Sequence, residues 1–339
     1  MNTEEIRRRR DEVIERSGPW TGTPIHLGNG LYTSENAWPD SKLRQIVQIV
    51  SDVTDRPLRT LRVLDLACLE GKYGIEMALH GAKVLAIEGR EVNLAKARFA
   101  KEVLGLDNLE LILDDVRHLD KERHGTFDVV LCLGILYHLD VPDVFNFIER
   151  MAAVCQRVAV IDTHISLRDI ESLDWNGKAY WGKFSEDHRT DSTPEEKLKA
   201  LWDSLDNVRS FQFTRPSLCN ALRHVGFTSV YACQSPSWSW LKYTEGPGKG
   251  KLIETFADRV TFVAIKGKGH RLLSSPVDEA APEFDLPEKP SFFEPPKDHK
   301  PGKGGESRPE ATRLQKGLRL LRQGKILTLL KKTVKQATG

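Results

Sequence analysis

The chain has 339 residues and a formal net charge of +2. This length suits one large domain with appendages, and a charge near zero argues against an overall attraction to polyanions, although local patches remain possible. The five cysteines lack paired ligand spacing, which predicts neither a disulfide framework nor a metal site. The N-terminus is charged and no segment has the length of a membrane span, so we expect a cytoplasmic protein.

Residues 1–60 are expected to form an N-terminal helical segment. Within it, residues 17–40 are rich in glycine, proline and aromatic residues, and they precede a helical pattern at 42–53. This stretch suits a lid that closes over a ligand, or an ordered crossing of the chain. The sequence leaves both open.

The next two predicted strands each end in acidic residues. Residues 63–66 form an apolar run with Asp65, followed by small residues up to Gly71, and the apolar run 84–88 ends in Glu88. Glu88 lies roughly 20 residues after the first turn, where a carboxylate can bind the ribose diol of a nucleotide. The alternative is structural, with Asp65 forming the turn and Glu88 capping the next helix.

Strands and helices continue to alternate along the chain. Further strands are predicted at 109–113, 127–132, 158–162, 227–231 and 260–265, and helices at 73–80, 91–104, 141–154 and 216–225. This alternation predicts an α/β fold with a Rossmann-like, doubly wound, seven-stranded sheet over 61–266, mostly parallel with the last strand antiparallel. A ligand should lie beyond the carboxyl ends of the strands.

The layout resembles motifs I and II of class I S-adenosylmethionine (SAM) methyltransferases. Their signature is an apolar strand followed by Asp-x-Gly-x-Gly-x-Gly; here Ala67 and Leu69 replace the first two glycines and Gly71 remains. Dinucleotide-binding Rossmann domains need more glycine, because they must hold a pyrophosphate that SAM lacks. The resemblance implies SAM as cofactor, bound by Asp65, Ala67, Cys68, Gly71, Glu88, Gly89, Asp115, Val116 and Gly134.

A narrower resemblance covers about residues 17–232. The blocks Gly18-Pro-Trp, Gly134-Ile-Leu-Tyr-His and Pro216-Ser-Leu, with Gly226-Phe, are similar to the branch that contains the tRNA wobble-uridine carboxymethyltransferases. That branch has arginines where this chain has Leu139-Asp140, and a lysine at Ser17. Basic residues suit a carboxylated SAM and an anionic RNA. Their replacement favours ordinary SAM and makes a nucleic-acid substrate unlikely.

The catalytic candidates follow the fourth and fifth strands. His138 is placed to remove a proton from an acceptor hydroxyl, because imidazole titrates near neutral pH. Alternatively, Tyr137 and His138 only shape the cofactor pocket. Asp162 and His164 are the next candidates for acceptor contact. Two metal-binding side chains without a third are weak evidence for a metal site there.

Residues 166–215 are predicted to be an insertion over the active site. Its aromatic and charged side chains suit a substrate pocket or the insertion's own small core. They are Trp175, Tyr180, Trp181, His188, Arg189, Trp202, Phe211 and Arg215. The whole pattern predicts methyl transfer to a small-molecule or glycan acceptor, most simply a hydroxyl. The alternatives are a tRNA-modifying (carboxy)methyltransferase and a non-catalytic binding module.

The C-terminal part changes in composition. Residues 267–310 are rich in Pro, Gly, Glu and Lys and are predicted to be a disordered linker. Residues 311–339 have leucines near one helical face and basic residues between them. Such a basic amphipathic helix suits peripheral contact with the inner membrane surface or a protein partner, or packing on its own domain.

Overall fold

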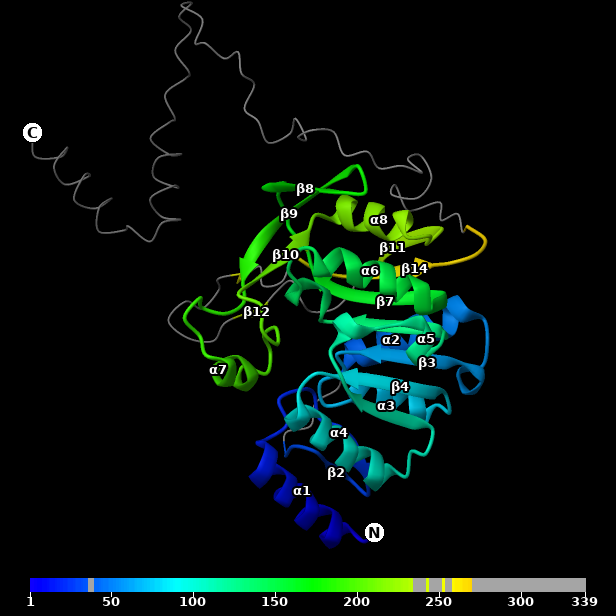
Figure 1. Cartoon of the computed structure of the whole chain (residues 1–339). Helices are drawn as coiled ribbons and strands as arrows, with labels where there is room; N and C mark the ends of the chain where they lie inside the picture. The colour runs from blue at the N-terminus through cyan, green and yellow to red at the C-terminus, as the bar shows by residue number, and fades with distance from the viewer. Residues whose placement is uncertain (36–39, 234–241, 244–251, 254–257, 270–339) are drawn as a thin grey trace, which may run out of the picture. The chain divides into compact units, whose positions relative to one another are not determined.

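The computed structural model describes residues 1–35, 40–233, 242–243, 252–253 and 258–269 (Figure 1). The predicted basic helix and almost all of the predicted linker lie outside these residues. No helix in the described part of the chain is both long and apolar enough to cross a membrane.

The centre of the fold is a seven-stranded sheet in the order β11-β14-β7-β6-β3-β4-β5. Its strands are β3 (Arg62–Leu66), β4 (Lys83–Glu88), β5 (Leu109–Leu113), β6 (Phe127–Leu133), β7 (Cys155–His164), β11 (Ser229–Cys233) and β14 (Arg259–Ile265). Only β14 is antiparallel to its neighbours, β7 and β11. The predicted seven-stranded Rossmann-like sheet, with its last strand antiparallel, is confirmed.

Helices cover both faces of this sheet. They are α2 (Ser41–Thr54), α3 (Lys72–Leu79), α4 (Glu91–Leu104), α5 (Lys121–His124), α6 (Asp143–Val154) and α8 (Arg215–His224), with short 3-10 helices η1 (Leu58–Thr60), η2 (Val116–His118) and η3 (Leu136–His138). Val63 packs with α2 and α3, whereas its neighbour Leu64 packs with α6 and α8. Successive strand residues point to opposite faces, so a strand covered on both sides must be apolar throughout.

The N-terminal segment packs onto the same core. Helix α1 (Thr3–Ser17) lies along α4, and the short hairpin of β1 (His26–Gly28) and β2 (Leu31–Tyr32) follows it. The Trp20 ring lies 5.8 Å from that of Phe99, and Ile6 and Val13 are buried. Residues 17–35 thus cross the domain as an ordered, packed segment.

The insertion forms a second, antiparallel sheet in the order β10-β9-β8. Its elements are β8 (Glu171–Trp175), β9 (Lys178–Glu186), α7 (Pro194–Lys199) and β10 (Arg209–Phe213); a separate short pair joins β12 (Lys242–Tyr243) and β13 (Leu252–Ile253). Phe145 of α6 packs against Trp175, Tyr180 and Phe211. Trp175, Tyr180 and Phe211 therefore join the core of the main sheet through Phe145, whereas Trp202 is 58% exposed.

Candidate active site

The loop after β3 keeps a glycine-type backbone without the usual glycines. Ala67 and Leu69 have φ values of 51° and 52°, and Gly71 has 81°. Non-glycine residues rarely adopt this left-handed region, which costs roughly 1–2 kcal/mol for each of them. A Cβ on Gly71 would lie 3.0 Å from that of Ala97. Of these three positions, Gly71 is therefore the one where a side chain would also be too crowded. Ala67 and Leu69 thus adopt a backbone conformation that glycine usually supplies.

Asp65, in the strand before this loop, is hydrogen-bonded to the helix that follows the loop. Its buried carboxylate accepts a hydrogen bond of 2.8 Å from the backbone N–H of Gly74 in α3. Burial raises the pKa of Asp65 to about 7, although the bond from Gly74 opposes the shift. A Cβ on Gly74 would lie 3.1 Å from the carboxylate, which explains the glycine. Asp65 thus joins β3 to the first turn of α3, the two elements that flank the loop, and its direct cofactor contact stays a prediction.

Glu88 connects the same loop to the end of β4. Its Oε2 accepts from Leu69 N at 2.9 Å, and its Oε1 accepts from Arg90 N at 3.0 Å and Asn93 Nδ2 at 3.1 Å. Burial raises the pKa of this carboxyl, and the three hydrogen bonds offset part of the shift. Glu88 is not the cap of α4, since the residue in the N-cap position is Arg90. A carboxylate has about four acceptor sites, so Oε2 retains room for a ribose hydroxyl.

The N-terminal segment is fastened to this loop by a buried ion pair. Lys96 Nζ lies 3.1 Å from Glu70 Oε1 and donates to Pro19 O at 2.7 Å. Glu70 in turn accepts from Thr21 N and Gly22 N at 2.7 and 2.8 Å. Sequence reasoning missed this pair, because the motif of the family leaves the position of Glu70 unspecified.

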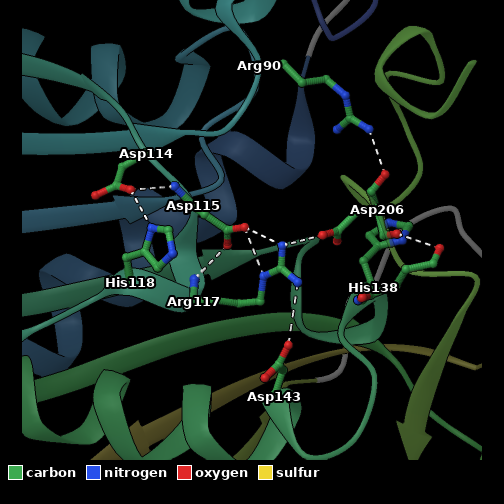
Figure 2. A network of polar contacts seen from close by, with 10 residues as sticks. Arg90, Asp114, Asp115, Arg117, His118, His138, Asp143 and Asp206 are labelled. Carbon is green, nitrogen blue, oxygen red and sulfur yellow. Dashed lines mark hydrogen bonds and ion pairs between the residues drawn. The ribbon is translucent and has the colours of Figure 1, made fainter. Parts of the chain in front are cut away.

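A set of charged side chains gathers where β5 ends (Figure 2). Asp115 accepts from Arg117 N at 2.8 Å and pairs with the Arg117 guanidinium at 2.5 Å. Arg117 also reaches Asp206 of the insertion at 2.9 Å and Asp143 of α6 at 3.5 Å. Val116 beside it is buried in the core. Asp115, one of the predicted cofactor residues, is therefore held in place by an arginine that also contacts the insertion.

Residues 187–207, called the cap segment below, extend from the insertion to the carboxyl ends of the strands. Arg90, just after β4, donates to the backbone carbonyls of residues 197, 198, 200, 203 and 204 at 2.8–3.2 Å. A Cβ on Gly89 would lie 2.5 Å from Leu205 Cδ1, so the segment packs directly on Gly89. Asn207 Nδ2 donates to His138 O at 2.9 Å. The cap segment is thereby attached next to three strand ends.

His138 pairs with an aspartate of the cap segment. Its Nδ1 lies 3.0 Å from Asp187 Oδ1, and both side chains are about 90% buried. An ionised carboxylate can only accept, so Nδ1 carries the hydrogen and Nε2 of the neutral ring is an acceptor. Tyr137 packs against His138, with ring centroids 4.2 Å apart. Asp187 was missed because it lies 49 residues away in the sequence.

Asp162, at the end of β7, is shared by two cations. Lys42 Nζ and Arg259 Nε each lie 2.6 Å from its Oδ1, and Thr261 Oγ1 donates to Oδ2 at 2.8 Å. Burial alone would raise the pKa of Asp162, but Arg259 and Lys42 hold it below its usual value. The sequence analysis identified neither Lys42 nor Arg259 as a site residue. They supply basic groups to the site, which Leu139-Asp140 after His138 do not.

Arg259 also connects Asp162 to the two remaining candidates. Its Nη1 lies 3.4 Å from Tyr137 OH and 3.4 Å from His164 Nε2, while His164 Nδ1 pairs with Asp258 at 3.2 Å. Burial and the charge of Arg259 lower the pKa of His164. A Cβ on Gly134 would lie 3.4 Å from Arg259 Nη2. Four predicted positions thus meet around one arginine. Among the described residues no three His, Cys, Asp or Glu side chains gather as a metal site.

Three of the cysteines lie inside the fold. Cys68, Cys132 and Cys155 are all buried, as expected for small apolar side chains. Burial raises the pKa of all three thiols, which keeps them neutral. Cys68 thus lies buried in the loop after β3 with a neutral thiol, and its contact with the cofactor stays a prediction.

Part of this site lies in a segment that is similar to known proteins. Residues 63–157 match a family of methyltransferase domains. A ubiquinone biosynthesis O-methyltransferase of Acinetobacter baumannii is 31% identical over 119 residues, which are 35% of this chain and 46% of that protein. A tRNA U34 carboxymethyltransferase of Helicobacter pylori is 31% identical over 134 residues, 39% of this chain and 48% of that protein. The chain thus spans about half the length of these curated relatives.

Solved structures agree on the fold. The N-terminal domain of EvdMO1, solved with S-adenosylhomocysteine (SAH) bound, has a TM-score of 0.59 and 24% identity, and the match covers 79% of this chain and 98% of that one. The matched residues 63–157 include the loop after β3, Glu88, Asp115 and His138. The chain therefore carries a class I SAM-dependent methyltransferase domain, and SAM is its cofactor.

Proposed function

We propose that this protein methylates a hydroxyl group of a small-molecule or glycan acceptor, with His138 as general base. The observation that carries the proposal is the buried His138–Asp187 pair. It fixes the tautomer that leaves Nε2 free to accept a proton. The Acinetobacter relative, named for O-methylation, supports a hydroxyl acceptor.

The reaction needs little chemistry from the protein itself. SAM supplies a methyl group bound to a sulfonium, and the acceptor oxygen must attack it in line. Holding the acceptor in that geometry lowers the barrier because the attack becomes effectively intramolecular. His138 Nε2 would take the hydroxyl proton as the new C–O bond forms and the bond between the methyl carbon and the sulfonium sulfur breaks, which leaves SAH. Asp187 would stabilise the imidazolium that results. Tyr137 keeps the imidazole ring in place by packing on it.

The test uses an acceptor found by incubating cell extract with labelled SAM and fractionating the product. With that acceptor, His138→Ala should lower turnover by roughly 10²–10⁴ while SAM affinity stays within a few-fold. Asp187→Asn should lower turnover less and change its pH profile. His118→Ala is the matched control, because His118 also pairs with an aspartate, Asp114, but is exposed. Parallel losses of SAM affinity and turnover in His138→Ala would show that the residue only shapes the pocket.

A second candidate function is supported by the two cations at Asp162. Lys42 and Arg259 share one carboxylate beside Tyr137, which suits an anionic group in the site. A carboxylated SAM would bring such a group, and the Helicobacter relative is named a carboxymethyltransferase. Calorimetry with SAM and with carboxylated SAM separates the candidates. Tighter binding of carboxylated SAM, lost in Arg259→Met, would favour the second, and RNA binding with a steep salt dependence would extend it to tRNA.

A further inference from the structure

The insertion sheet has two faces of opposite character. Facing α6 are aromatic side chains of β9 and β10, among them Tyr180, Phe211 and Phe213. The other face carries Trp181, Lys183 and Ser185 of β9, with Ser210 and Gln212 of β10. The register pairs Ser210 with Ser185 and Gln212 with Lys183, and directly paired residues point to the same face. The second face is therefore polar.

Several polar atoms on this second face are buried and have no partner. Ser210 is fully buried and Gln212 is 8% exposed. Ser210 Oγ, Gln212 Oε1 and Trp181 Nε1 are buried atoms that make no hydrogen bond within the described part of the chain. Buried polar groups without partners cost stability and are rare in native proteins, so three on one face need an explanation.

The polar face continues to the proposed base. Asp187 follows β9 and keeps its alternation, since Asp187 N still donates to Val208 O of the neighbouring chain segment. Its Oδ1 contacts His138, while its Oδ2 is buried without a partner in the described residues. Beside β10, Phe211 N donates to Leu139 O, which joins the sheet to the segment that carries His138. The unsatisfied groups and the base thus belong to one surface.

We propose that this face, formed by Trp181, Ser210, Gln212 and Asp187, binds the methyl acceptor, and that the acceptor is a polyhydroxylated, sugar-type molecule. The face offers an indole N–H donor, an amide and a carboxylate acceptor, and a hydroxyl that can do both. Several hydroxyl groups on one ring match such a set, whereas a flat phenol would leave most of it unsatisfied. The half-buried Trp181 ring adds a flat apolar surface for a sugar ring. The inference rests on the proposed hydroxyl methylation and narrows its substrate class.

Binding is measured on the full-length protein saturated with SAH. The probes are D-fucose, a panel of methyl pyranosides, and catechol as the flat phenol, titrated by saturation-transfer NMR. We expect pyranosides to bind and catechol not to bind. Trp181→Phe keeps a ring but loses the N–H, and Ser210→Ala and Gln212→Met lose one group each; each should weaken pyranoside binding about threefold to tenfold. Trp202→Phe is the control, because Trp202 is the exposed tryptophan of the same insertion.

A second readout separates ligand binding from a structural role. If the three groups serve a ligand, Ser210→Ala and Gln212→Met should leave the melting temperature unchanged or raise it, because each removes an unsatisfied buried group. A lowered melting temperature together with unchanged pyranoside binding would overturn the proposal. Binding of catechol but of none of the pyranosides, with methylation of a phenol, would also overturn the proposal of a sugar-type acceptor. The proposed methylation of a hydroxyl would still hold in that case. If the wild-type protein does not bind SAH, the proposed function itself is refuted.

Discussion

Arg90 offers a direct test of how the cap segment is held. Its guanidinium reaches five backbone carbonyls, but Nε and Nη2 carry only three N–H groups between them. Four carbonyls around Nη2 must therefore share two hydrogens. At a net value near 1 kcal/mol per hydrogen bond, Arg90 stabilises the attached segment by about 3 kcal/mol. Arg90→Met keeps much of the apolar stem and removes every donor.

The assay is amide hydrogen exchange resolved over residues 193–207. A loss of about 3 kcal/mol should accelerate exchange there roughly 10²-fold, because each 1.4 kcal/mol is a factor of ten. The central strands should keep their protection. Arg98→Met is the matched control on the same helix, since the pair that Arg98 makes with Glu91 is exposed. Wild-type exchange in Arg90→Met would refute the idea that this side chain fastens the cap segment.

Three further changes test the cofactor side. Glu88→Gln should weaken SAM binding at least tenfold in calorimetry. The control, Glu91→Gln at an exposed position, should not weaken it. Equal SAM affinities of Glu88→Gln and the wild type would show that Glu88 does not bind the ribose. Asp65 has a folded pKa of about 7 against 3.8 unfolded, so the folded state retains its proton between these values and stability falls as pH rises. In urea unfolding, Asp65→Asn should lose that slope and gain up to about 4 kcal/mol at pH 8; an unchanged slope contradicts the assignment. Truncation after Gly269 should leave SAH binding intact, because the sheet ends at Ile265.

The sheet could be predicted because its signals are local. A strand covered on both faces is largely apolar, and residues 129–133 of β6 show this without knowledge of their neighbours. The helix 91–104 was equally clear and ends at Gly105 in the left-handed conformation that glycine favours. Leu69 was the misleading residue. It weakens the loop motif on paper, yet its backbone adopts the left-handed conformation all the same.

The contacts of the site could not be predicted, because they depend on topology. Lys42 and Asp162 are 120 residues apart, and Arg259 reaches Asp162 only because β14 runs antiparallel beside β7. No local pattern distinguishes such a lysine from any other on a helix. The argument from the missing arginines after His138 has the same limit. It examined sequence neighbours, whereas the basic groups come from the first and last parts of the domain.

The cap segment also connects the two halves of the site. Through Arg90 and Asp206 it is attached to the ends of β4 and β5, where the cofactor is expected (Figure 2). Through Asp187 it holds the proposed base. A segment fastened at both places cannot leave one without straining the other. Loosening it at Arg90 should therefore lower turnover through His138 even at saturating SAM. A variant that lost only SAM affinity would show that the two attachments act independently.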